Sequence, residues 1–196
     1  MYQLFCFDMS SVLVTLHGGN FIGGDSSWDK EQTELLKSMC YIVYQIDFPK
    51  TNLKECLESI RCQVKDIRSK YSLLKVHVLG RSSGGYLAKI LFDEGIFDKA
   101  IYIAPVFDPL KRAELVPELG NKSLRFFENQ HVPKTSVWDK DRELLLLALN
   151  DENVPTDCFN EKQLECAIYL GPKTHSGLLK TTSREFQECI NDFLSK

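Results

Sequence analysis

The sequence lacks a basic excess, a dense basic run and a long uninterrupted apolar stretch. Its 196 residues carry a formal net charge of −3, whereas nucleic-acid-binding chains usually carry clustered Lys and Arg. The first residues are apolar, but no basic segment precedes them and Asp8 interrupts them. We therefore expect no nucleic-acid partner, no membrane-surface patch, no signal peptide and no membrane span.

The cysteines lack any pattern that would indicate a metal site or a disulfide framework. There are seven, an odd number, and no two form a C-x-x-C pair. Most lie in apolar or periodic stretches, where a free cysteine acts as a small hydrophobic residue. We expect a reducing, cytoplasmic compartment, no metal and no organic cofactor.

The overall composition is ordinary for a globular protein, with 43% hydrophobic and 26% charged residues. These values exclude a disordered chain, a collagen-like chain and a coiled coil. No internal repeat or linker-like stretch is evident. The length predicts one domain over residues 1–196, large enough to bury about 70% of its unfolded surface.

Six short apolar runs are each closed by turn residues, which predicts buried strands of a parallel sheet. The fifth run, LLLLAL, also fits a buried helix on propensity, but its short length and polar closure favour a strand. The predicted strands are residues 12–16, 40–46, 74–79, 100–104, 144–149 and 167–170.

Helical stretches alternate with these runs. Residues 51–70 place apolar side chains at spacings of three and four, with Thr51 as the expected N-cap. Residues 84–94 and 183–194 follow the same pattern, and 123–130 predict a short helix in a segment with no room for a large cap. The alternation predicts an α/β fold with a mostly parallel, doubly wound sheet of about six strands flanked by helices. Ligands of such sheets bind beyond the carboxyl ends of the strands.

The run GRSSGG at residues 80–85 lies between a predicted strand and a predicted helix. This is a G-x-S-x-G motif in the context where a sharp turn lifts the central Ser82 above the sheet, ready to act as a nucleophile. A glycine-rich turn that only packs tightly, or that holds a phosphate group, is the alternative.

The run HGGN at residues 17–20 follows the first strong strand. Its glycines allow backbone N–H groups to face a ligand, and acyl transfer needs such donors for the negative charge that develops on oxygen. A simple turn is the alternative. Glycine turns after both strands together indicate the layout of a hydrolase that uses a serine nucleophile.

That layout requires an acid and then a histidine further along the chain. Asp151 follows the fifth predicted strand and His175 follows the sixth, so both lie at the expected edge. Several other residues are weaker candidates: Asp108 is a second possible acid, and His17 is expected to shape its loop. The remaining alternatives are Glu152, Asp157, His77 and His131, with Trp28 and Trp138 as possible pocket residues.

With these motifs the chain resembles the α/β-hydrolase superfamily, most closely its esterase, lipase and arylformamidase-like members with an HGG loop. The resemblance runs from Val12 to the last helix. It implies an α/β-hydrolase fold with a reduced N-terminus and a small or absent cap. It also implies a catalytic triad of Ser82, Asp151 and His175, and an oxyanion hole formed by the backbone N–H groups of Gly19, Asn20 and Ser83.

The function predicted from these residues is a serine hydrolase that cleaves a small carboxylic ester, thioester or amide through an acyl-enzyme on Ser82. Its partner would be a small acyl substrate, and the oligomeric state stays open. Asn20 and Arg81 depart from the common pattern of relatives, and they motivate the alternative of a silent fold that only binds a ligand or protein. We expect the Arg81 side chain to face away from the pocket into a salt bridge.

Overall fold

The computed structural model describes residues 11–127, 138–171 and 173–196. Six parallel strands form one sheet in the order β2-β1-β3-β4-β5-β6. Their bounds are β1 Ser11–Leu16, β2 Ile42–Ile46, β3 Lys75–Arg81, β4 Ala100–Ile103, β5 Glu143–Leu147 and β6 Ala167–Tyr169. The predicted parallel sheet of about six strands is confirmed, and the run LLLLAL contributes a strand, not a helix.

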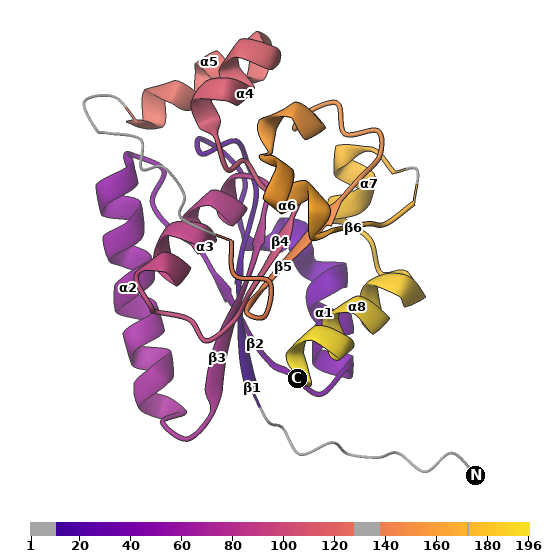
Figure 1. Cartoon of the computed structure of the whole chain (residues 1–196). Helices are drawn as coiled ribbons and strands as arrows, with labels where there is room; N and C mark the ends of the chain where they lie inside the picture. The colour runs from indigo at the N-terminus through magenta and orange to yellow at the C-terminus, as the bar shows by residue number, and fades with distance from the viewer. Residues whose placement is uncertain (1–10, 128–137, 172) are drawn as a thin grey trace.

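Helices cover both faces of the sheet. Helices α2 (Leu53–Lys70) and α3 (Ser83–Asp93) lie on one face, and α1 (Lys30–Ser38) and α8 (Arg184–Leu194) lie on the other (Figure 1). The shorter elements are η1 Ser26–Asp29, α4 Pro109–Leu115, α5 Pro117–Leu124, η2 Arg125–Phe127, η3 Thr156–Cys158, α6 Glu161–Glu165 and α7 His175–Leu179.

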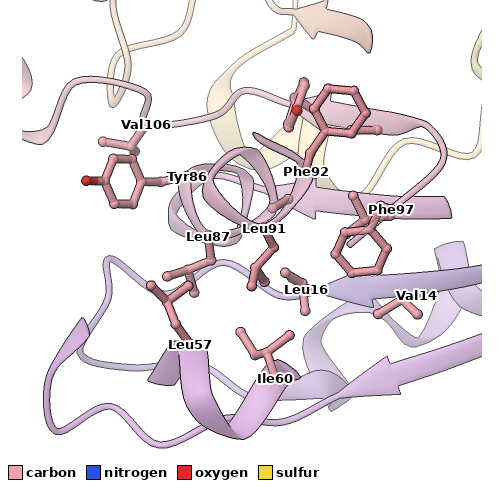
Figure 2. Close-up of a cluster of buried hydrophobic side chains, with 14 of the residues drawn as sticks. Val14, Leu16, Leu57, Ile60, Tyr86, Leu87, Leu91, Phe92, Phe97 and Val106 are labelled. Carbon is pink, nitrogen blue, oxygen red and sulfur yellow. The ribbon is translucent and has the colours of Figure 1, made fainter. Parts of the chain in front are cut away.

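Successive side chains along a strand point alternately to the two faces of the sheet. Val12, Val14 and Leu16 of β1 pack in the layer under α2 and α3, whereas Leu13 packs in the layer under α1 and α8. Figure 2 shows the first layer, where Val14 and Leu16 lie among side chains of α2 and α3. Because both faces are covered, the strands read as nearly continuous apolar runs.

The strand order reverses at β1. The chain passes from β1 to β2 at one edge of the sheet and then returns to place β3 on the other side of β1. As a result, the chain leaves β1 toward α1 on one face and leaves β3 toward α3 on the opposite face (Figure 1). Such a reversal opens a crevice at the carboxyl ends of the two strands.

Several strand boundaries differ from the predicted ones by one or two residues. β2 begins at Ile42 instead of 40, because Cys40 has a φ of 68° and belongs to the turn that ends α1. β4 ends at Ile103, because Ala104 has a φ of 43°. The fifth and sixth strands end at Leu147 and Tyr169, earlier than predicted.

Two helix predictions also need correction. The N-cap of α2 is Asn52 and not Thr51, since the Asn52 side chain accepts the Glu55 backbone N–H at 3.0 Å. The helix predicted over 123–130 lies earlier, at α5, where Pro117 occupies the first turn and is preorganised for helix. Residues 128–130 lie outside the described residues.

The segment between β4 and β5 holds α4, α5 and η2 within its described part, and these elements lie beyond the carboxyl edge of the sheet (Figure 1). No larger unit is present in the described residues of this segment. Before β1, residues 1–10 lie outside the described range, so the predicted reduction of the N-terminus is not tested there.

Candidate active site

Ser82 occupies the turn between β3 and α3, and its backbone is strained. Its φ of 49° and ψ of −119° are rare for a residue with a side chain. Three hydrogen bonds hold the turn: Ser82 donates its N–H to the Ile103 carbonyl at 2.9 Å, and the Ser82 carbonyl accepts from Gly85 at 2.9 Å and Val106 at 3.1 Å. The side chain makes no capping bond to α3, so its hydroxyl is free for other partners.

The glycines around Ser82 are required by close packing. A Cβ at Gly84 would lie 2.4 Å from the carbonyl oxygens of Leu16 and His17, and one at Gly80 would lie 2.7 Å from the Ala88 Cβ. Helix α3 therefore begins in direct backbone contact with the end of β1. This contact brings Ser82 beside the loop that follows β1.

A continuous chain of hydrogen bonds joins Ser82, His175 and Asp151. His175 Nε2 lies 3.1 Å from Ser82 Oγ, and His175 Nδ1 lies 2.8 Å from Asp151 Oδ2 and 3.0 Å from Oδ1. Ser82 and His175 are only 5% and 6% exposed. A neutral imidazole that donates from Nδ1 to the carboxylate leaves Nε2 to accept the serine proton, which is the arrangement that activates a hydroxyl as a nucleophile.

Each of the three side chains comes from the carboxyl edge of the sheet. Asp151 follows β5, and its Oδ1 also accepts the backbone N–H groups of Asn153 at 2.9 Å and Val154 at 2.8 Å. His175 begins α7, whose N-cap Thr174 accepts the Gly177 N–H. The carboxylate and the imidazole are thus oriented by their own loops before any ligand binds.

The loop after β1 turns tightly beside Ser82. Gly19 has a φ of 130°, and a Cβ there would lie 2.0 Å from the Gly23 carbonyl oxygen. At Gly18 a Cβ would lie 3.2 Å from the Ser82 Cβ, so the loop runs directly past the serine. The hydrogen bonds recorded among the described residues leave the backbone N–H groups of Gly19, Asn20 and Ser83 available to a ligand.

A cleft of about 730 Å³ opens over these residues. Its lining includes Ser82, His175 and the Gly18–Asn20 loop, with further residues from η1, α4, α5 and α7. Trp28 is 59% exposed at the cleft, with Leu119 and Leu179 as further apolar surface. Of the two tryptophans considered, Trp28 thus lines the cleft, whereas the Trp138 ring packs against Tyr102 and Phe107.

The weaker acid candidates have other contacts. Asp108 caps α4 by accepting the Lys111 N–H at 2.9 Å, and Asp157 lies exposed in η3. Glu152 accepts the backbone N–H of His175 at 3.3 Å and so contacts the backbone of this histidine, not its ring.

The two other histidines of the described residues, His17 and His77, make no hydrogen bond with Ser82. His77 is buried in β3, where burial lowers its pKa to about 4. The His17 ring stacks on Phe48 with centroids 4.3 Å apart, and its Nδ1 lies 2.6 Å from the Gly18 carbonyl oxygen. This position matches the prediction that His17 shapes its loop. His131 lies outside the described residues.

Arg81 is not among the residues that line the cleft, and its side chain forms a buried salt bridge, as expected from the sequence. Its Nη1 lies 3.1 Å from Asp29 Oδ2, its Nε donates to Gln32 Oε1 at 2.6 Å, and the side chain is fully buried. Burial lowers the pKa of Arg81 to about 10. Gln32 donates in turn to the Thr181 carbonyl at 2.7 Å, which connects β3 through α1 to the chain just after α7.

Arg112 and Lys180, two cations that line the cleft, were not predicted from the sequence. Arg112 lies on α4 and Lys180 directly follows α7. A local signal for Arg112 did exist, since the pair Asp108-Pro109 is a typical helix start and puts residue 112 one turn into a helix that follows β4.

No protein-family model matches the sequence, and no curated protein matches it either. Solved structures do match. Esterase B from Lactobacillus rhamnosis has a TM-score of 0.71 at 14% identity, over 96% of this chain and 76% of that one. An α/β serine hydrolase without a lid from Xanthomonas campestris has a TM-score of 0.67 at 12% identity, over 96% and 84%.

A third match is an acetyl ester-xyloside bifunctional hydrolase from Caldicellulosiruptor lactoaceticus, with a TM-score of 0.67 at 15% identity over 95% of this chain and 83% of that one. Together with the strand order, these likenesses show that the chain has the α/β-hydrolase fold. At such identities they establish the fold alone.

Among the described residues, no helix is both long and apolar enough to cross a membrane. Within the same ranges, His, Cys, Asp and Glu side chains form no group of three that could hold a metal ion.

Proposed function

We propose that the protein is a serine hydrolase that cleaves a small carboxylic ester, thioester or amide through an acyl-enzyme on Ser82. The observation that carries this proposal is the hydrogen-bonded chain from Ser82 Oγ through His175 to Asp151, buried under a cleft at the reversal point of the sheet. One sheet supplies all three residues, which supports a single domain.

In the first half of the reaction, His175 Nε2 takes the hydroxyl proton while Ser82 Oγ bonds to the substrate carbonyl carbon. The Asp151 carboxylate stabilises the imidazolium that forms, because it already accepts the Nδ1 hydrogen at 2.8 Å. His175 then gives the proton to the departing alcohol, thiol or amine. The carbon–leaving-group bond breaks and the acyl group stays on Ser82.

In the second half, His175 takes a proton from water, whose oxygen attacks the acyl carbon. The Ser82–carbon bond then breaks, Ser82 regains its proton and a carboxylic acid leaves. In both halves negative charge develops on the carbonyl oxygen, and the proposed donors are the backbone N–H groups of Gly19, Asn20 and Ser83. This mechanism requires no metal and no organic cofactor.

We expect short acyl groups to be preferred. The larger apolar residues that line the cleft are Trp28, Leu119 and Leu179. The described segment between β4 and β5 adds only short helices over the site. Two structural neighbours agree with this expectation: the Xanthomonas serine hydrolase has no lid, and the Caldicellulosiruptor enzyme is an acetyl ester-xyloside bifunctional hydrolase.

The alternative of a catalytically silent fold was motivated by two unusual residues, Asn20 and Arg81, and both have structural contacts that explain their presence. Asn20 directs its side chain to Arg112 and the Leu119 carbonyl, and Arg81 is paired with Asp29 and Gln32. The residues that depart from the common pattern thus have partners of their own.

The test is hydrolysis of a small library of esters, thioesters and formamides by the wild type and by Ser82→Ala. We expect the wild type to hydrolyse p-nitrophenyl acetate and Ser82→Ala to lose at least about 10³-fold in kcat, since no other nucleophile lies at this position. A fluorophosphonate probe should label the wild type at Ser82 and leave Ser82→Ala unlabelled. Equal rates for both proteins, or no labelling and no hydrolysis, would contradict the proposal.

A further inference from the structure

Asn20 stands in the loop after β1, and its backbone N–H is one of the proposed oxyanion donors. Its φ of 57° lies in the left-handed region, where glycine is favoured and a side chain is tolerated only with support. Both ends of its amide are hydrogen-bonded. Oδ1 accepts from Arg112 Nη1 at 2.5 Å, and Nδ2 donates to the Leu119 carbonyl at 2.9 Å.

Arg112 extends this contact to the loop that carries the acid. The residue is only 3% exposed, and its Nε donates to the Asn153 carbonyl at 2.9 Å. Asn153 lies two residues after Asp151 and gives its own N–H to Asp151 Oδ1 at 2.9 Å. One guanidinium therefore bonds the loop after β1 and the loop after β5.

We propose that Arg112 is a positioning residue, which fixes the oxyanion loop through the Asn20 side chain and the acid loop through the Asn153 carbonyl. This inference rests on the proposed function. Its chemical basis is the planar guanidinium, whose Nε and Nη1 donors point in fixed directions at two acceptors. A lysine ammonium carries its three donors on one nitrogen and cannot reproduce this geometry.

The alternative role for Arg112 is direct binding of an anionic substrate group, because the residue lines the cleft together with Lys180. The two roles predict different results. A positioning residue affects every substrate and acts mainly on kcat, whereas an anion-binding residue affects KM for charged substrates only.

The first experiment is independent of catalysis and follows hydrogen–deuterium exchange of the peptides that contain residues 18–24 and 151–154. Arg112→Met removes the donors and keeps much of the side-chain length. Lys111→Met is the matched control, since Lys111 is the exposed neighbour on the same helix. We expect Arg112→Met to speed exchange in both peptides at least about 10-fold, and Lys111→Met to leave it unchanged. Unchanged exchange in Arg112→Met would overturn the proposal.

A second pair of variants covers the case in which Arg112→Met does not fold. Asn20→Ala removes the acceptor, whereas Asn20→Asp keeps an oxygen for Arg112. We expect fast exchange of residues 18–24 in Asn20→Ala and near wild-type exchange in Asn20→Asp. Equal exchange in the two variants would contradict a tether through this oxygen.

The second experiment compares a neutral acetate ester with a hemisuccinate ester. For both substrates, we expect Arg112→Met to lower kcat about 10- to 100-fold with little change in KM, as a small displacement of reacting groups does. Arg112→Lys should not restore the rate. The double variant Arg112→Met/Asn20→Ala should be no slower than the slower single variant.

Two results would overturn the positioning role. One is that Arg112→Met raises only KM, and only for the hemisuccinate ester. The other is that Arg112→Lys has the wild-type kcat. If the wild type hydrolyses no substrate and takes no fluorophosphonate label, the proposed function fails, and the exchange experiment still decides whether Arg112 tethers the two loops.

Discussion

The backbone of Ser82 is strained, and hydrogen bonds from neighbouring residues hold it in this conformation. Its φ of 49° is costly for any residue with a Cβ, while its N–H and carbonyl are fixed by β4 and by the chain that follows β4. Strain of this kind costs about 1–3 kcal/mol and is often found at functional positions.

This strain leads to a prediction about stability. We expect Ser82→Gly to have a free energy of unfolding about 1 kcal/mol higher than Ser82→Ala, because glycine adopts the turn without strain while its extra unfolded-state entropy offsets part of the gain. Urea unfolding of the two inactive variants measures the difference. A less stable Ser82→Gly would show that the turn is not strained.

At the scale of elements, the buried pair of Arg81 and Asp29 joins β3 to the chain entering α1. Asp29 is 8% exposed, and burial raises its pKa despite the nearby guanidinium. Gln32 on α1 then bonds to the Thr181 carbonyl beyond α7. Buried polar groups therefore connect β3 through α1 to the chain between α7 and α8.

We predict that Arg81→Leu lowers the free energy of unfolding by about 3 kcal/mol or more, because it leaves the Asp29 carboxylate buried without its partner. Arg81→Leu/Asp29→Asn should recover most of this loss, since it removes both charges. Urea unfolding near pH 7 measures both effects.

The control is Arg184→Leu, which breaks the exposed Arg184–Glu188 pair and should change stability little. The ratio of kcat/KM for acetate and hemisuccinate esters should be the same in Arg81→Leu as in the wild type. A changed ratio would mean that Arg81 reaches the substrate.

The elements themselves were predictable to different degrees. Apolar runs closed by turns located all six strands, and α2 and α8 have strong helical periodicity. By contrast, α1 was not predicted, because Gln32 and Thr33 interrupt the apolar pattern on its buried face. The helix expected over 123–130 was misplaced, because the apolar side chains of Phe126 and Phe127 lie in η2.

The part of the candidate site that could be predicted depends on the order of its residues along the chain and on their positions after strands. Ser82, Asp151 and His175 each follow a strand, and parallel strands bring these positions to one edge. Arg112 was not predictable in its role, because its partner Asn20 lies 92 residues away and nothing local marks the contact. Contacts of this kind follow from packing of the whole chain, not from a motif.

At the scale of the whole molecule, buried histidines make stability depend on pH. His77 is 1% exposed on the face covered by α1 and α8, and its Nδ1 has no hydrogen-bond partner among the described residues. Burial lowers its pKa from 6.5 to about 4, although Asp98 nearby acts in the opposite direction. The folded protein thus binds this proton less readily than the unfolded chain does.

We therefore predict that the His77 contribution to stability is complete above about pH 6.5 and is lost as the pH falls to about 4. The loss is about 3 kcal/mol, since each unit of pKa difference corresponds to about 1.4 kcal/mol. His77→Leu should flatten the decrease, which urea unfolding at several pH values in this window measures. An equally steep decrease in His77→Leu would assign the pH dependence to other groups, among them His17, whose pKa burial also lowers.

Helix α8 ends at the edge of the sheet opposite the cleft. Lys99, just before β4, donates from Nζ to the Phe193 carbonyl at 2.7 Å, and the last residues lie at the amino ends of the strands (Figure 1). A linker attached after α8 would therefore anchor the protein to a solid support with its cleft facing the solution. Immobilised protein should accept substrate as freely as dissolved protein, which suits this attachment to surface-based binding assays and to reuse on beads.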